Sequence, residues 1–288
     1  MKTESLVKIK KINLAKRRFQ KKSQLFRCPI CKSQIIVENQ FYCEQGHSFD
    51  FSKKGYLNLK VNGKSQKYPR QLFEARKNIC EQGFYNFLIT EICQIIKEEF
   101  RDKKSLTLLD AGSGEGSHLK KITETLKNEN NYYLGIDISK EGIELSSQHE
   151  ADISWLVSDL AQLPIANHSL DIILNILSPA NYQEFSRVLK KDGLLIKVIP
   201  NKNYLIELRE YTQQEEYSNE EVRYHFEENY KLKLVKIIEQ DFKITKELLD
   251  DFLLMTPLTQ QLNLRAETIN KEIKSIHLDL SILVGSPL

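Results

Sequence analysis

Apolar residues recur with two different spacings along this chain, and the changes of spacing divide it into segments. Between residues 71 and 100 they recur every three to four positions, which predicts two amphipathic helices separated at Gly83. Strand-like and helix-like runs then alternate, and this alternation predicts an α/β fold with a parallel, doubly wound sheet. The strand-like runs are Leu106–Asp110, Tyr132–Asp137, Ile153–Val157, Asp171–Ile176 and Leu194–Ile199, and the helix-like runs include His118–Lys127, Lys140–His149 and Asn181–Lys190.

After residue 200 the pattern changes. A helical segment is followed by a strand near Leu232–Ile238, a helix near Thr245–Leu254 and a last apolar run over Ile276–Val284. The two strand-like runs predict an antiparallel pair at one edge of the sheet.

The first 70 residues have a different character. Short alternating stretches with a Pro and a Gly are typical of a small β-rich knuckle, and the Gly, Ser and Pro that follow are typical of a linker. The Lys- and Arg-rich start forms either a short helix or a disordered arm. We therefore expect a basic arm at 1–24, a knuckle at 25–60, a linker at 61–70 and an α/β domain at 71–288.

Charge is distributed unevenly between the two ends. Residues 1–77 hold 19 Lys and Arg against 5 Asp and Glu, a net charge of +14, and the remaining residues carry −11. A basic end on an acidic body favours a polyanion as the partner of that end. The alternative is a solvated basic tail that only aids solubility.

Composition restricts the class of protein. The chain of 288 residues is 41% hydrophobic and 28% charged, which suits a medium domain with a small accessory one. No apolar run is long enough for a bilayer span and no secretory signal is present, so we expect a cytoplasmic protein without a membrane partner. Five cysteines without a signal peptide fit a reducing compartment, where clustered Cys more often bind metal than form disulfides.

The spacing of three cysteines and a histidine predicts a metal site. Cys28 and Cys31 are separated by two residues, and Cys43 precedes His47 by four positions. Each pair forms a tight turn that points both ligands at one ion, and three thiolates with an imidazole suit a structural, four-coordinate zinc. The alternative is buried Cys with an incidental His. Cys80 and Cys93 lie singly in helical patterns and are interpreted as core thiols.

A glycine-rich loop follows the first strand of the α/β region. It reads Asp110-Ala111-Gly112-Ser113-Gly114-Glu115-Gly116, and glycines there allow a sharp turn and close approach of the backbone to a ligand. Dinucleotide enzymes use a related loop, so the loop by itself is weak evidence. The carboxylate of Asp110 suits a charged cofactor without phosphate, and Asp137 after the next strand lies where ribose hydroxyls would sit. Asp159 after the third strand either contacts an adenine or caps a helix.

Several short motifs accompany the zinc spacing and the glycine loop. They are Gly55-Tyr56-Leu57-Asn58-Leu59, Ala75-Arg76-Lys77, Gly83-Phe84-Tyr85, Leu163-Pro164, Ser178-Pro179-Ala180 and Met255-Thr256-Pro257. Together these motifs resemble one family, the RlmA 23S ribosomal RNA guanine-N1 methyltransferases. The resemblance covers about residues 25–288 and implies a class I S-adenosylmethionine methyltransferase fold, Rossmann-like with an antiparallel final strand.

The resemblance implies a reaction and its site. Family members methylate a guanine in a hairpin loop of large-subunit ribosomal RNA, and some Gram-positive members are linked to macrolide resistance; a homodimer is left open. The zinc ligands are then Cys28, Cys31, Cys43 and His47, and the cofactor contacts are Tyr85, Gly114, Glu115 and, where a relative has a His, Tyr204.

Direct methyl transfer requires positioning, exclusion of water and removal of the proton on guanine N1. No residue is assigned as the base. Asn175 and the turn at Ser178-Pro179-Ala180 follow the fourth strand, at the sheet edge where ligands bind, and either contact the target base or merely shape the turn. Two rival functions are a small-molecule methyltransferase, which needs no zinc knuckle, and a non-catalytic zinc-ribbon binding protein, which needs no glycine loop.

Overall fold

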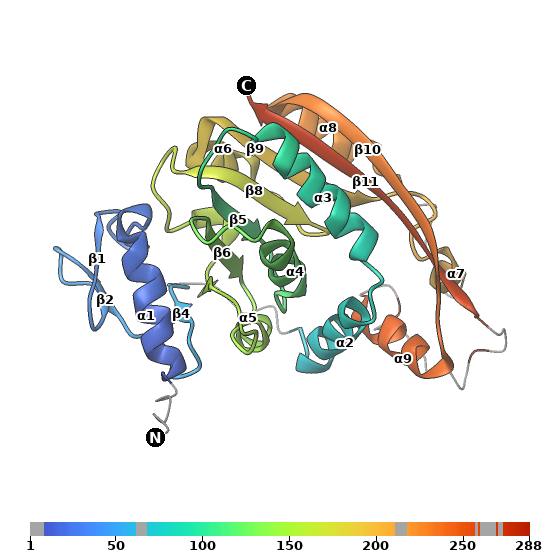
Figure 1. Cartoon of the computed structure of the whole chain (residues 1–288), viewed down its shortest axis with the longest axis horizontal. Helices are drawn as coiled ribbons and strands as arrows, with labels where there is room; N and C mark the ends of the chain where they lie inside the picture. Colours follow the sequence, from blue (N-terminus) through green and yellow to red (C-terminus); the bar gives the residue numbers. More distant parts are fainter. Residues whose placement is uncertain (1–8, 62–67, 211–217, 257–258, 260–268, 270–272) are drawn as a thin grey trace, which may run out of the picture.

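The N-terminal part of the chain is a small module at one end of the molecule (Figure 1). The computed structural model describes residues 9–61, 68–210, 218–256, 259, 269 and 273–288, so that most of the predicted linker lies outside the described residues. The module consists of helix α1 (Lys11–Lys21), the 3-10 turn η1 (Ser23–Leu25) and an antiparallel sheet of β1 (Ile35–Val37), β2 (Phe41–Cys43) and β3 (Ser48–Phe49).

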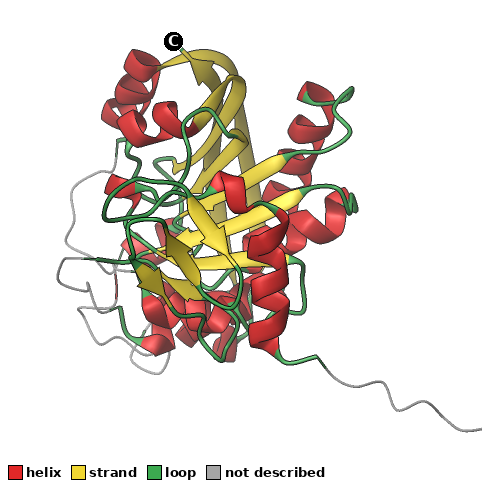
Figure 2. Ribbon diagram, turned by 90° about the vertical axis from the view of Figure 1, so that its left-hand side faces the viewer, coloured by secondary structure: helices red, strands yellow, loops and turns green. Residues whose placement is uncertain are grey.

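A twisted eight-stranded sheet forms the centre of the remainder (Figure 2). Its order is β10-β11-β9-β8-β5-β6-β7-β4. The strands from β9 to β4 are parallel to their neighbours, and β11 is antiparallel to both β9 and β10. The strands are β4 (Leu57–Asn58), β5 (Thr107–Ala111), β6 (Tyr132–Asp137), β7 (Ile153–Val157), β8 (Leu170–Ile176), β9 (Leu189–Pro200), β10 (Tyr230–Lys243) and β11 (Ser275–Pro287).

Helices cover both faces of this sheet, as a parallel sheet requires. One face packs against α2 (Arg70–Glu81), α3 (Asn86–Glu99), α4 (Ser117–Leu126), α5 (Lys140–Ser146) and α9 (Lys246–Met255). The other packs against α1, α6 (Tyr182–Val188) and α8 (Glu220–Asn229). The short helix α7 (Ile206–Arg209) follows β9, and none of the helices that the structure describes has the length and apolar character needed to cross a bilayer.

Helix α1 covers the part of the second face that lies over β6 and β7. The connection after β7 contains only the 3-10 turn η2 (Leu160–Gln162), which is too short to cover these strands. Ala15 and Phe19 of α1 are buried in the same apolar cluster as Leu134 and Leu156 of the sheet. The N-terminal segment therefore completes the core of the α/β domain.

The structure confirms the α/β class and the antiparallel final pair, and the five predicted parallel strands occur within one residue of their predicted limits, except that β9 begins five residues earlier. Of the two alternatives for the basic segment, the structure shows the helix, over 11–21, and this helix is packed on the α/β domain. The expected knuckle differs in one respect: Leu57 pairs with Leu156, so that β4 joins the large sheet. One apolar core thus crosses the expected limits at residues 24 and 60.

We predict that apolar packing, and not ion pairing, holds α1 in place. Phe19 is fully buried, with its ring centroid 5.1 Å from that of Phe26 and 5.5 Å from that of Phe51. Phe19→Ala should lower the free energy of unfolding by about 3–5 kcal/mol. Asp152 accepts from Arg18 and Lys21, but half of its side chain is exposed, so Asp152→Ala should cost about 1 kcal/mol or less. Urea denaturation of both variants measures the difference, and equal losses would contradict this ranking.

Candidate functional site

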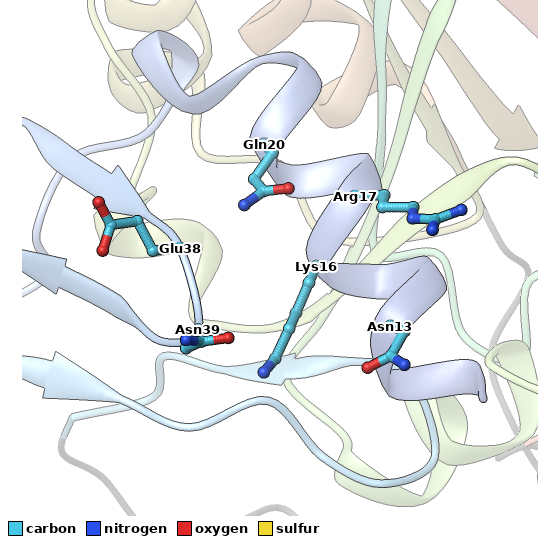
Figure 3. A pocket seen from close by; sticks show the side chains of 6 residues that line it. All are labelled: Asn13, Lys16, Arg17, Gln20, Glu38 and Asn39. Atoms are coloured by element: carbon cyan, nitrogen blue, oxygen red, sulfur yellow. The ribbon is translucent and has the colours of Figure 1, made fainter. Parts of the chain in front are cut away.

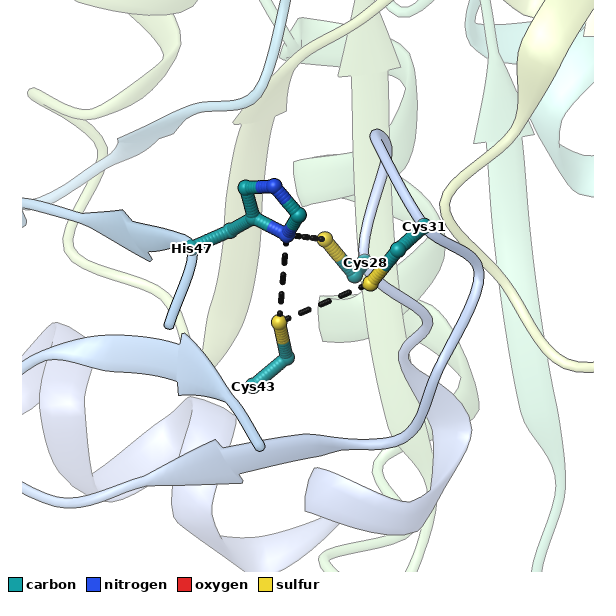
Figure 4. A group of neighbouring side chains, drawn as sticks. All are labelled: Cys28, Cys31, Cys43 and His47. Atoms are coloured by element: carbon teal, nitrogen blue, oxygen red, sulfur yellow. Dashed lines mark hydrogen bonds between the residues drawn. The ribbon is translucent and has the colours of Figure 1, made fainter. Parts of the chain in front are cut away.

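The four predicted metal ligands converge on one point in the N-terminal module (Figure 4). Their ligand atoms all lie within 4.8 Å of one another. Cys28 and Cys31 lie on a turn before β1, closed by a hydrogen bond from the Lys32 N–H to the Cys28 carbonyl. Cys43 ends β2, and its N–H donates to the carbonyl of His47. This hydrogen bond closes a second turn, which faces the first.

The separations fit a zinc ion. In a tetrahedral site with Zn–S of about 2.3 Å and Zn–N of about 2.0 Å, neighbouring donors lie roughly 3.5–3.8 Å apart. The Sγ atoms of Cys31 and Cys43 are 3.6 Å apart, and Nδ1 of His47 lies 3.5 Å from Cys43 Sγ and 3.7 Å from Cys28 Sγ. A hydrogen bond with Ser33 lowers the pKa of the Cys31 thiol to about 6, which favours the thiolate that a metal requires.

The glycine loop turns sharply after β5. Gly112 adopts a φ of +86°, and the N–H groups of Gly112 and Ser113 both donate to the carbonyl of Ile136 on the neighbouring strand β6. A Cβ on Gly112 would lie 1.9 Å from Oγ of Ser178, so only glycine fits between the two loops. At Gly114, by contrast, a Cβ would stay 3.8 Å from the nearest protein atom, on Phe73, although φ is +54°.

The contact between Gly112 and Ser178 marks the switch point of the sheet. The strands β5 and β8 are neighbours there, although β6 and β7 intervene in the chain. In doubly wound sheets, ligands bind where adjacent loops diverge at this position. The turn at residues 178–180 therefore lies beside the glycine loop.

A buried polar network fixes this turn. The side-chain amide of Asn175 donates to the carbonyls of Ala111 and Pro179, and Nζ of Lys197 donates to Asn175 Oδ1 and to the Ser178 carbonyl. Burial lowers the pKa of Lys197 to about 8. Leu177 has a φ of +50°, a strained conformation for this residue type. Asn175 is thus used for positioning: it ties the end of β5 to the turn.

Carboxyl groups surround the loop. Asp137 ends β6 and accepts from the N–H groups of Gly114 and Ser139, at 2.8 and 2.7 Å. Asp110 is almost fully buried, and desolvation together with the charges of Asp137 and Glu115 raises its pKa to about 8. Negative charges held this close favour a cationic ligand.

The other expected cofactor residues differ in whether their side chains already have hydrogen-bond partners within the protein. Glu115 is buried, and its carboxylate accepts from the N–H and hydroxyl of Ser117. Asp159 accepts from the Ala161 N–H at 2.9 Å and caps η2, which is the cap alternative of the sequence analysis. Tyr85 and Tyr204 are buried with their hydroxyls 2.7 Å apart, so two residues 119 positions apart in the chain meet.

Comparison with known proteins agrees with both halves of this description. A zinc-ribbon family described as RlmA, N-terminal, matches residues 26–67, and one described as Methyltransferase domain matches residues 102–251. A Bacillus subtilis protein named "Putative 23S rRNA (guanine-N(1)-)-methyltransferase YxjB" is 36% identical over 91% of this chain and 96% of its own length. The chain belongs to the RlmA family.

One further relative and one solved structure share less sequence with this RlmA-family chain. The 23S rRNA (guanine(748)-N(1))-methyltransferase of Streptomyces fradiae is 27% identical over 63% of the chain and 65% of its own length. The solved structure of a SAM dependent methyltransferase from Aquifex aeolicus is 16% identical, with a TM-score of 0.43, and covers 68% of this chain and 88% of that one.

Two residues of α2 beside the RlmA-family glycine loop were not among the predicted site residues. The Phe73 ring packs against Gly114 and Gly142, and the Arg76 guanidinium lies 5.9 Å from the centre of that ring. The charge of Arg76 lowers the pKa values of Asp137, Tyr85 and Tyr204, although burial outweighs it at each of them. Helical periodicity placed both residues on α2 but gave no sign that this helix lies over a loop 40 positions away.

We predict that the zinc cluster is required for folding of the module. Structural zinc contributes on the order of 10 kcal/mol to the folding of small modules, so Cys43→Ser should abolish the single bound zinc and unfold residues around it. Cys93→Ser is the matched control, because Cys93 is a buried thiol of α3 outside the cluster. Metal analysis and circular dichroism of the purified chains test this, and a full complement of zinc in Cys43→Ser would contradict it.

We also predict that S-adenosylmethionine binds more tightly as the pH rises to about 8. The cationic ligand favours the ionised form of Asp110, whose pKa of about 8 keeps it protonated at neutral pH in the free protein. Below a pH of about 8, Asp110 must lose its proton when the ligand binds. The affinity for S-adenosylmethionine therefore falls by up to about tenfold for each pH unit below that value, and binding releases a proton to the solvent. Calorimetry between pH 6.5 and 8.5 measures both quantities. Asp110→Asn should flatten the profile, and an unchanged profile would exclude Asp110 as its source.

Proposed function

We propose that this chain transfers the methyl group of S-adenosylmethionine to N1 of a guanine in a hairpin loop of large-subunit ribosomal RNA. The observation that carries the proposal is the alignment, over nearly the whole length of both chains, with a relative whose name states this reaction. The zinc cluster, the glycine loop and the acidic surroundings of that loop supply the parts that such a reaction needs.

The chemistry depends on bringing two reactants together. S-adenosylmethionine, when bound, supplies an electrophilic methyl group on a positively charged sulfur. The residues of the chain hold S-adenosylmethionine and the guanine in line and exclude water, so that the N1–methyl bond forms as the sulfur–methyl bond breaks. The N1 proton passes to a general base for which no residue is assigned. The glycine loop holds S-adenosylmethionine. The turn at Ser178 holds the guanine, because this turn touches the glycine loop at Gly112.

We assign the residues as follows. Structural zinc is held by Cys28, Cys31, Cys43 and His47. The cofactor is held by Asp110, Gly112, Gly114 and Glu115 of the loop, by Asp137, by the pair Tyr85 and Tyr204, and by Asp159, which also caps η2 through one of its two carboxylate oxygens. The limits of the two domains near residues 60 and 70, a cytoplasmic location, a homodimer and macrolide resistance stay predictions from sequence and resemblance.

The decisive test is identification of the methylated nucleotide. The purified chain is incubated with labelled S-adenosylmethionine and either an unmodified 23S ribosomal RNA transcript or a small-molecule extract. We expect label in RNA as 1-methylguanosine, mapped by mass spectrometry to one hairpin loop. Gly112→Ala should lower the rate at least 100-fold, because its Cβ would displace Ser178. Label in small molecules, or at another atom or base of RNA, would refute the proposal.

A further inference from the structure

The basic residues of α1 form two sets with different surroundings. Lys11 donates to the Ser147 carbonyl, and Arg18 and Lys21 pair with Asp152, so these three cations already have partners on the α/β domain. Lys16 and Arg17 form no such contact with any residue that the structure describes. Two cations on a rigid helix thus remain available for a ligand.

These two residues line a groove between α1 and the turn that joins β1 to β2. Its volume is about 470 Å³, and it is lined by Asn13, Lys16, Arg17, Gln20, Glu38 and Asn39 (Figure 3). Figure 3 shows Lys16 reaching from α1 toward Asn39 on the turn. The volume lies within the range of roughly 300–1,000 Å³ that is typical of ligand sites.

The groove has the chemistry of a nucleotide site. Between residues 9 and 37 the chain carries nine Lys and Arg and no Asp or Glu, so the surroundings attract phosphate. Three amide side chains at the groove offer both donors and acceptors, which match the edges of an unpaired base. The carboxylate of Glu38 repels a phosphate but can accept a hydrogen bond from the amino group of a base. A bound nucleotide is therefore oriented with its phosphate toward Lys16 and Arg17 and its base toward Glu38.

We propose that this groove binds an unpaired nucleotide of the RNA substrate away from the methylated guanine. The inference rests on the proposed function for the identity of the polymer. It assigns a binding role to an element that precedes residues 26–67, the part matched by the zinc-ribbon family. The packing of α1 on the sheet holds the groove at a fixed distance from the glycine loop, so the contact sets how the RNA is presented.

The experiment compares two double variants of the full chain that remove the same charge from the same helix. Lys16→Gln with Arg17→Gln removes the groove cations, and Arg18→Gln with Lys21→Gln removes those paired with Asp152. Binding of an unmodified 23S ribosomal RNA transcript is measured across a salt series. Each single-strand phosphate contact contributes about 0.7 to the slope of log affinity against log salt.

We expect the groove variant to lower the slope by about 0.7, for the one phosphate that both cations hold, and to raise KM for RNA severalfold at unchanged kcat. The control should keep the wild-type slope, and both should retain full zinc content and S-adenosylmethionine affinity. Asn13→Ala with Asn39→Ala should weaken RNA binding without changing the salt slope, because a neutral amide releases no counterion from a phosphate.

An equal decrease of the salt slope in the two double variants would show that RNA binding responds only to overall charge, and would contradict a nucleotide site in the groove. An unchanged slope in the groove variant would overturn it as well. In both cases methylation of the transcript by the wild-type chain leaves the proposed function standing. A wild-type chain that neither binds nor methylates RNA would refute the proposed function, and the groove with it.

Discussion

A parallel sheet is stable only when both of its faces are covered, and this constraint determines how the N-terminal module sits. The connection after β7 is a single 3-10 turn, so the chain supplies no local helix to cover β6 and β7 on that side. Helix α1 fills the gap with Ala15 and Phe19, and β4 extends the same sheet beyond β7. The zinc module is therefore joined to the α/β domain through a shared apolar core. A module held in this way presents its surface to a substrate at a fixed orientation.

The site depends on the same sheet through its switch point. Because β5 and β8 are adjacent, the loops that follow them meet, and the absence of a side chain at Gly112 allows Ser178 to approach. Asn175 then joins both loops, and the ammonium of Lys197 fixes which way its amide faces. A buried network with its partners satisfied holds one geometry, and such precision matters where two reacting atoms must be aligned. The strained backbone at Leu177 is maintained by these surroundings.

Local signals in the sequence were sufficient for the parts of the protein that local physics determines. Buried parallel strands read as continuous apolar runs, and two turns with paired ligands indicate zinc before any fold is known. Long-range packing left no such signal. Nothing in the periodicity of α1 distinguishes a helix on a sheet from a free amphipathic arm, and two residues of β4 are too few to show a strand. Asp159 illustrates a third case, since a carboxylate before a turn reads equally as a cap or as a ligand. The Ala161 contact shows the cap and uses one of the two carboxylate oxygens.

The division of charge between the two ends follows from the different charges of the two reactants. Asp137 and Glu115 bring negative charge to the glycine loop, and Asp110 adds to it once ionised; this charge attracts a sulfonium cation but repels a phosphate. The RNA backbone must then be held elsewhere, and only an uncharged base can approach the loop at low electrostatic cost. The free-energy cost of moving that base out of its stack has to be offset by contacts between the protein and the rest of the RNA. A basic surface remote from the loop, on an element fixed to the same sheet, meets this requirement.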